Sequence, residues 1–114
     1  MVAMTKYFAR AQSVAPREEW EESLDAERTG DFTRALRVQE RLNASSGLDY
    51  GGCMRVAWLH FKAGGYRRAR EYYEIANLFS EGSKKPLLGA LDCCIAMGDL
   101  DGASEYLDSI SYRA

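Results

Sequence analysis

The chain has 114 residues, which is the length of one domain and too short for two independent cores. Apolar residues make up 46% and charged residues 28%, close to the averages of folded globular proteins, so the composition excludes a disordered or collagen-like chain. The formal net charge is −2, and the absence of a broad positive field argues against a nucleic-acid partner.

The first predicted element is an amphipathic helix over residues 1–15, which would add a half-unit to the helices that follow. A mitochondrial presequence is the alternative, because the segment carries Lys6 and Arg10 and no acidic residue. The same two residues and Gln12 interrupt the apolar block that a secretory signal needs. Pro16 suits the first turn of a second helix, from about residue 17 to residue 28.

Turn-forming residues divide the rest of the chain into further helices. Residues 43–49 (NASSGLD) predict a turn, with Asp49 as the cap of the next helix. Residues 80–85 (SEGSKK) predict a second turn, after which Pro86 opens a helix. The last predicted helix covers about residues 101–112. Apolar residues recur with the helical period almost throughout, and no run approaches the roughly 18 residues of a membrane-spanning helix.

Three segments of the chain share one pattern at a fixed period. A glycine recurs at intervals of 34 residues, at Gly30, Gly64 and Gly98. Each glycine is followed two residues later by a large apolar residue and five residues later by an alanine: Phe32, Tyr66 and Leu100, then Ala35, Ala69 and Ala103. Glycine permits the left-handed backbone of a tight turn, and alanine permits two helices to cross closely. Each segment is therefore predicted to be the turn and second helix of a helical pair.

This pattern resembles the tetratricopeptide repeat, a helix–turn–helix unit of 34 residues, and in particular small bacterial proteins with three such repeats. The resemblance implies an all-α fold, a right-handed α-solenoid of antiparallel helix pairs. The implied divisions are an N-terminal helix or half-unit over 1–15, a degenerate repeat over 16–49, and repeats over 50–83 and 84–114. Repeat 1 departs from the family where Glu22 and Ser23 replace packed apolar residues.

The resemblance also implies a non-enzymatic, chaperone-like adaptor that holds an apolar peptide or helix of another protein in a concave groove lined by the first helices. Tryptophan and arginine are favoured anchors at such interfaces. For Trp58 and Phe61 the alternative is packing between repeats. A clamp for a chain-terminal carboxylate is not expected, because only Lys85 suits it. The groove residues implied by the family are Trp20, Leu24, Met54, Arg55, Trp58, Phe61, Lys62, Lys85, Leu88 and Asp92.

A second hypothesis is a structural assembly module that self-associates or docks through its terminal helices. The family usually adds a solvating helix after the last repeat, because a terminal unit leaves one apolar face bare. The sequence ends near the end of the last predicted helix, so the association edge is expected at Tyr106, Leu107 and Ile110. Such an edge would produce a homo-oligomer or a larger complex.

No motif for catalysis or for a cofactor is present in the sequence. The chain has one histidine, His60, and its three cysteines are Cys53, Cys93 and Cys94. Cys53 and His60 fall on one helix face, so a metal site with a later cysteine is one interpretation; packing of small thiols between helices is the better one, because no recognised zinc spacing occurs. We therefore expect neither a metal nor a cofactor. The odd cysteine count favours a reducing, cytoplasmic compartment.

Two runs of like charge complete the pattern. Acidic residues crowd the helix after Pro16, and basic residues crowd the turn of the second repeat. Oppositely charged surfaces can steer partners, but a solvated face is the simpler interpretation. The residues concerned are Glu18, Glu19, Glu21, Glu22, Asp25 and Glu27 in the first run and Lys62, Arg67, Arg68 and Arg70 in the second.

Overall fold

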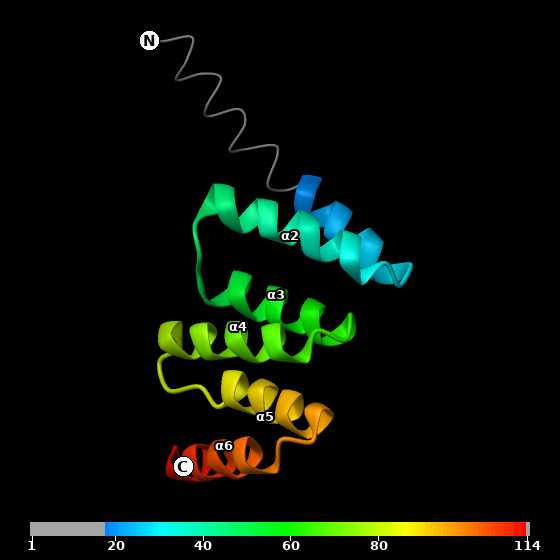
Figure 1. The fold of residues 1–114 in the computed structure, drawn as a ribbon. Helices are drawn as coiled ribbons and strands as arrows, with labels where there is room; N and C mark the ends of the chain where they lie inside the picture. Colours follow the sequence, from blue (N-terminus) through cyan, green and yellow to red (C-terminus); the bar gives the residue numbers. More distant parts are fainter. Residues whose placement is uncertain (1–17, 114) are drawn as a thin grey trace. The chain divides into compact units, whose positions relative to one another are not determined.

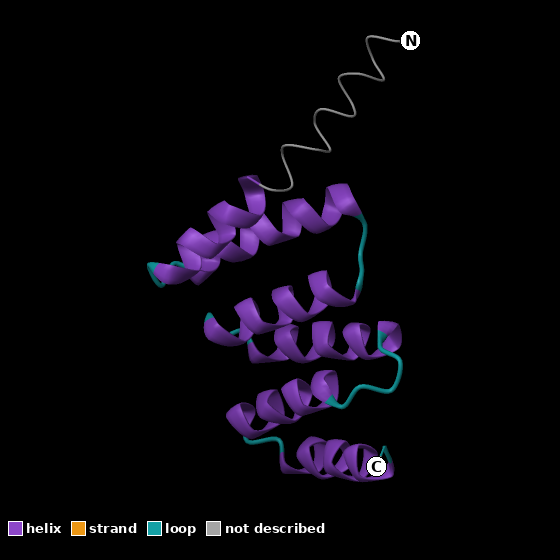
Figure 2. Ribbon diagram, turned by 180° about the vertical axis from the view of Figure 1, so that it is seen from behind, coloured by secondary structure: helices purple, strands orange, loops and turns teal. Residues whose placement is uncertain are grey.

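The computed structural model describes residues 18–113, and all regular structure within them is helical (Figures 1 and 2). The helix predicted over residues 1–15 lies outside the described residues. The chain divides into two compact units, Met1–Gly47 and Leu48–Ala114. The all-α prediction is confirmed, and one helix pair lies within each of the three predicted repeat ranges.

The Met1–Gly47 unit contains a helix over residues 18–28 and α2 (Phe32–Ser46). The chain reverses direction at Gly30, whose φ of 80° is the left-handed conformation predicted for this glycine. Asp31 caps α2, because its carboxylate accepts a hydrogen bond from the Arg34 backbone N–H at 3.1 Å. Ser23 is fully buried and its hydroxyl donates to the Ala35 carbonyl at 3.3 Å. A small polar residue thus serves in the helix crossing of this degenerate repeat.

The turn predicted over residues 43–49 is too long. α2 continues through residues 43–46 and ends at Gly47, where φ is 88°. Local side-chain hydrogen bonds accompany this last turn, since Gln39 Nε2 donates to Asn43 Oδ1 at 3.2 Å and the Ser45 hydroxyl donates to the Leu42 carbonyl at 3.1 Å. Serine and asparagine are common in turns, but here they extend the helix.

The Leu48–Ala114 unit consists of α3 (Tyr50–Lys62), α4 (Tyr66–Phe79), α5 (Lys85–Met97) and α6 (Leu100–Tyr112). Each helix packs on the next one in the chain, and α3 also contacts α5 (Figure 1). Asp49 caps α3 as predicted, since it accepts from the Gly52 N–H at 2.7 Å, and Asp99 caps α6 by accepting from the Gly102 N–H at 3.0 Å. Gly65, in the corresponding place of the middle turn, provides no side-chain cap to α4.

Small side chains let α3, α4 and α5 approach closely. The core cluster consists of Ala57, Ala69, Tyr73, Ala90 and Cys93, and the three alanines and the cysteine are fully buried. A Cβ placed on Gly89 of α5 would lie 2.5 Å from the ring of Tyr73 on α4, so α5 contacts this ring directly through its backbone. Such contacts require small residues at the helix crossings.

Polar contacts tie the last helix of this unit to the preceding helix pair. Arg70 Nη1 lies 3.1 Å from Asp99 Oδ2, and the Tyr106 hydroxyl donates a hydrogen bond to the Glu74 carboxylate. Arg113 Nη1 donates to the Ser83 carbonyl at 2.8 Å. The two ends of α6 are therefore both linked to residues of the repeat before it. Among the described residues, no helix is long and apolar enough to cross a membrane.

Candidate functional site

Trp58 is the centre of a partly exposed cluster on α3. The Arg55 guanidinium carbon lies 5.8 Å and the Lys62 Nζ 5.6 Å from the centroid of the Trp58 ring. The three residues are separated by three and four positions, so they share one face of the helix. Contacts between cations and aromatic faces contribute about 0.5–1 kcal/mol at exposed sites, which stabilises this arrangement of the ring.

A second exposed stripe runs along α5, the helix that contacts α3. Lys85, Leu88 and Asp92 are exposed and lie at helical spacing on one face. Ile95 continues the same face and is 61% exposed, and Leu88 is 46% exposed. The stripe therefore alternates charged and aliphatic side chains along α5, in the order Lys85, Leu88, Asp92 and Ile95.

The other predicted groove residues are not part of the Trp58 cluster or the α5 stripe. Met54 and Phe61 pack against the core cluster, and the Phe61 ring contacts Tyr66 edge-on with centroids 5.2 Å apart. Both residues therefore mainly pack α3 against the core and add little to the exposed surface around Trp58. Trp20 and Leu24 lie on the helix over 18–28, four positions apart, and Trp20 is 41% exposed.

The three residues predicted as an association edge differ in exposure. Tyr106 packs against the core cluster, and its hydroxyl binds Glu74. Ile110 is half-buried, and Leu107 is 52% exposed. Sequence reasoning missed Leu100, which is 77% exposed. Its distance of seven positions from Leu107 places the two leucines on one side of α6, and that spacing was the available signal.

The thiols and the histidine are packed inside the Leu48–Ala114 unit. All three cysteines are free and fully buried, and His60 stacks on Tyr72 with ring centroids 5.7 Å apart. Burial raises the pKa of the Cys93 thiol to about 11, with smaller contributions from Cys94 and Asp92. A thiol with a pKa raised in this way is a poor nucleophile at neutral pH. Within residues 18–113, no three His, Cys, Asp or Glu side chains are grouped so that they could hold a metal ion.

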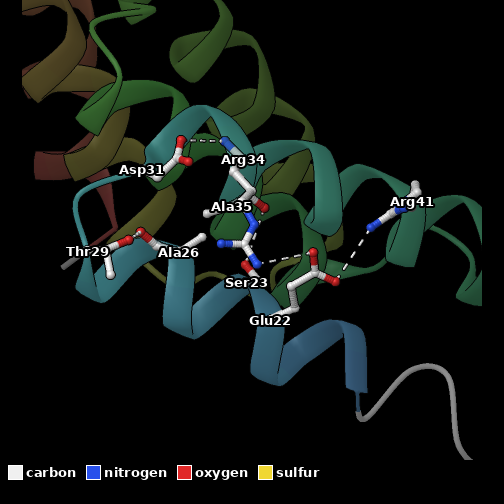
Figure 3. A network of polar contacts seen from close by, with 8 residues as sticks. All are labelled: Glu22, Ser23, Ala26, Thr29, Asp31, Arg34, Ala35 and Arg41. Atoms are coloured by element: carbon white, nitrogen blue, oxygen red, sulfur yellow. Dashed lines mark hydrogen bonds and ion pairs between the residues drawn. The ribbon is translucent and has the colours of Figure 1, made fainter.

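Sequence reasoning also missed a polar network in the Met1–Gly47 unit. Figure 3 shows Glu22 with Arg34 on one carboxylate oxygen and Arg41 on the other, at 3.5 and 3.8 Å. The sequence feature that could have indicated this network is the helical spacing of the arginines on α2.

The fold matches those of solved tetratricopeptide repeat (TPR) structures. PcrH in complex with the chaperone-binding region of PopB matches with a TM-score of 0.74 and 18% identity, over 87% of this chain and 80% of that one. PcrH from Pseudomonas aeruginosa matches with 0.74 and 19%, over 88% and 76%. The second TPR of Spaghetti (RPAP3), bound to the HSP90 peptide SRMEEVD, matches with 0.72 and 17%, over 93% and 98%.

No family model and no curated protein matches the sequence. The chain is nevertheless TPR-like in structure, as its 34-residue pattern predicted, and these matches at below 20% identity show the fold.

Proposed function

We propose that the chain is a non-enzymatic protein-interaction module that binds an apolar peptide or amphipathic helix of another protein. The observation that carries this proposal is Trp58, a partly exposed aromatic ring placed between two cations. Support comes from the similar structures, since PcrH was solved with a segment of PopB and RPAP3 with a peptide of HSP90. A tryptophan next to an arginine is typical of the residues that dominate binding energies.

The proposed surface consists of the stripe of Arg55, Trp58 and Lys62 on α3, which is partly exposed, and the exposed stripe of α5. Trp58 and Leu88 would receive apolar side chains of the ligand, while Arg55, Lys62 and Lys85 would favour acidic residues beside them. Asp92 would oppose acidic residues at the far end of the α5 stripe. Met54 and Phe61 are partly exposed, and their exposed atoms would add apolar contacts to the ligand. Trp20 and Leu24 remain proposed contacts on the helix over 18–28.

The test begins with peptides selected by phage display on the intact chain, whose affinity is then measured by calorimetry. Trp58→Ala is expected to weaken binding at least about tenfold, because an aromatic anchor contributes about 2 kcal/mol or more. Arg55→Glu is expected to weaken it as well. Tyr112→Ala and Arg68→Glu are the matched controls, since both side chains are exposed and lie outside the two stripes. Unchanged affinity in folded Trp58→Ala and Arg55→Glu variants would refute the proposed surface.

A second candidate function is assembly through α6, and the exposure of Leu100 and Leu107 on one side of that helix favours it. Light scattering over a concentration series tests this candidate. Self-association of the native chain that is lost in Leu107→Glu would support it, because this side chain is half exposed and its replacement leaves the core intact. A native chain that stays monomeric, or a variant that associates equally, would eliminate it.

For the compartment, we propose the reducing cytoplasm. The support is that Cys53, Cys93 and Cys94 are all free. Thiol alkylation in intact cells before and after denaturation would show whether they are reduced in vivo.

A further inference from the structure

A hollow of about 580 Å³ lies on the surface of the Met1–Gly47 unit, and none of the residues that line it is assigned to the proposed peptide surface. This volume falls within the range of about 300–1,000 Å³ of sites that hold small ligands or a few side chains of a partner. The residues that line it are Glu22 from the helix over 18–28 and Arg34, Arg37, Val38, Glu40, Arg41 and Ala44 from α2.

The lining is positively charged because three arginines outnumber two glutamates. Arg34, Arg37 and Arg41 follow one another at intervals of three and four residues, so their side chains leave the same face of α2. The helix thus directs three guanidinium groups toward one hollow. Guanidinium groups match the planar, two-oxygen geometry of carboxylates.

One carboxylate of the chain already occupies part of this hollow. Glu22 places Oε1 3.5 Å from Arg34 Nη2 and Oε2 3.8 Å from Arg41 Nη2 (Figure 3). Both distances exceed those of good charge-assisted hydrogen bonds, and the three side chains are 40% to 63% exposed. Ion pairs of this kind are weak and open to competition from another carboxylate.

The third arginine has no such partner among the residues that the structure describes. Arg37 is exposed and makes no hydrogen bond or ion pair with any residue of the described part, 18–113. Ala44 is exposed and adds apolar surface beside it, and the largely buried Val38 also lines the hollow. The hollow therefore combines one unpaired cation, two weakly paired cations and a small apolar floor.

We propose that this hollow binds an acidic peptide segment of a partner protein. Carboxylates of the peptide pair with Arg37 and displace Glu22 from Arg34 and Arg41, and an aliphatic side chain of the peptide rests on Val38 and Ala44. Glu22 then acts as an internal competitor, which holds the arginines in place when no peptide is bound. This site is independent of the proposed function, because its lining includes none of the residues assigned to the proposed peptide surface.

The probe is a short fluorescent peptide in which pairs of glutamates alternate with single leucines, measured by anisotropy with the intact chain. A peptide with glutamine at every glutamate position is its control. Arg37→Gln is expected to weaken binding about two- to fivefold, and Arg37→Gln with Arg41→Gln about tenfold or more. Glu22→Gln is expected to tighten binding about twofold or more, because it removes the competitor while keeping the side-chain shape.

Arg28→Gln is the matched control within the same unit, since Arg28 is exposed and pairs with Asp25 outside the hollow. It is expected to leave the affinity unchanged. Circular dichroism verifies that each variant is folded. If the double variant does not fold, the single variant Arg37→Gln still tests the proposal, because Arg37 contacts no charged partner in the described residues.

Three results would overturn the proposal. The first is equal binding of the glutamine peptide, or no binding of the glutamate peptide at millimolar concentration. The second is an equal effect of Arg28→Gln and Arg37→Gln, which would show general charge attraction. The third is loss of binding in Trp58→Ala with no effect of Arg37→Gln, which would place the acidic peptide on α3 and α5 and leave the proposed function intact.

Discussion

Arg70 on α4 and Asp99 before α6 form an ion pair across 29 positions of sequence, with 3.1 Å between Nη1 and Oδ2. The other oxygen of the same carboxylate accepts a hydrogen bond from the Gly102 backbone N–H at 3.0 Å. Asp99 therefore caps α6 and also links it to the preceding helix pair. One side chain therefore contributes both to the start of a helix in one repeat and to the packing of that repeat on the one before it.

Asp99→Ala is expected to lower the free energy of unfolding by about 1–2 kcal/mol, because it removes the cap and the ion pair together. Asp99→Asn keeps a capping oxygen and loses only the ion pair, so it is expected to cost less than half as much. Urea denaturation followed by circular dichroism gives both values. Equal losses in the two variants would show that the cap contributes nothing.

Gly89→Ala is expected to destabilise the protein, although alanine is normally favoured over glycine within a helix by about 1 kcal/mol. The new Cβ would lie 2.5 Å from the ring of Tyr73, which is buried in the core and cannot move away freely. Gly51→Ala is the matched control on α3, since its Cβ would meet only Asp49 Oδ1 at 3.9 Å. Thermal melting of the two variants is expected to give shifts of opposite sign. A higher melting temperature for both would contradict the close approach of α5 to Tyr73.

Ala69→Leu is expected to be among the most destabilising single changes in the middle of the chain. Ala69 is fully buried on α4, which packs against both α3 and α5, and overpacking of such a site typically costs about 1–3 kcal/mol. Ala103→Leu at the equivalent place of α6 is expected to cost less, because Ala103 is 8% exposed and α6 packs mainly on α5. Denaturant midpoints compare the two, and equal losses would argue against the equivalence of the repeats.

Stability is expected to fall in alkaline solution. Burial raises the pKa of Cys93 from 9.0 to about 11 and that of Tyr73 from 10.0 to about 12. Between pH 9 and 11 for Cys93, and between pH 10 and 12 for Tyr73, the unfolded chain loses the proton while the folded chain keeps it, so the folded state loses stability relative to the unfolded state as the pH rises. Below pH 9 the two groups are protonated in both states and make no difference.

Denaturation at a series of pH values measures this slope. Cys93→Ala removes one of the two groups and is expected to flatten the decline between pH 9 and 11, whatever its effect on the absolute stability. A native chain whose stability is constant up to pH 11 would show that these groups are not buried in solution.

The sequence predicted the architecture well because each signal was local. Gly30, Gly64 and Gly98 lie at positive φ, as a tight turn between helices requires. Asp31, Asp49 and Asp99 cap helices because capping depends on residues only three positions away. The repeat pattern also indicated the buried alanines at the helix crossings, Ala35, Ala69 and Ala103, since they occupy one column of the repeat.

The candidate sites were harder to predict because they depend on contacts between helices. The family resemblance placed Met54 and Phe61 in the same groove as Trp58, whereas the structure packs both of them against the core. The packing of Tyr106 was equally hard to predict, because its hydrogen-bond partner Glu74 lies 32 positions away in sequence and no local pattern shows that pairing. The arginine-lined hollow depends on Glu22 reaching α2 from a different helix.

The central claim is that the exposed stripes of α3 and α5 bind a peptide segment of another protein. Amide chemical shifts of the chain, measured by NMR with and without a phage-selected peptide, test it most directly. We expect the largest changes at Trp58 and its indole N–H, with further changes at Leu88 and Asp92 and none along α6. Changes confined to α6, or spread evenly over the chain, would contradict this account.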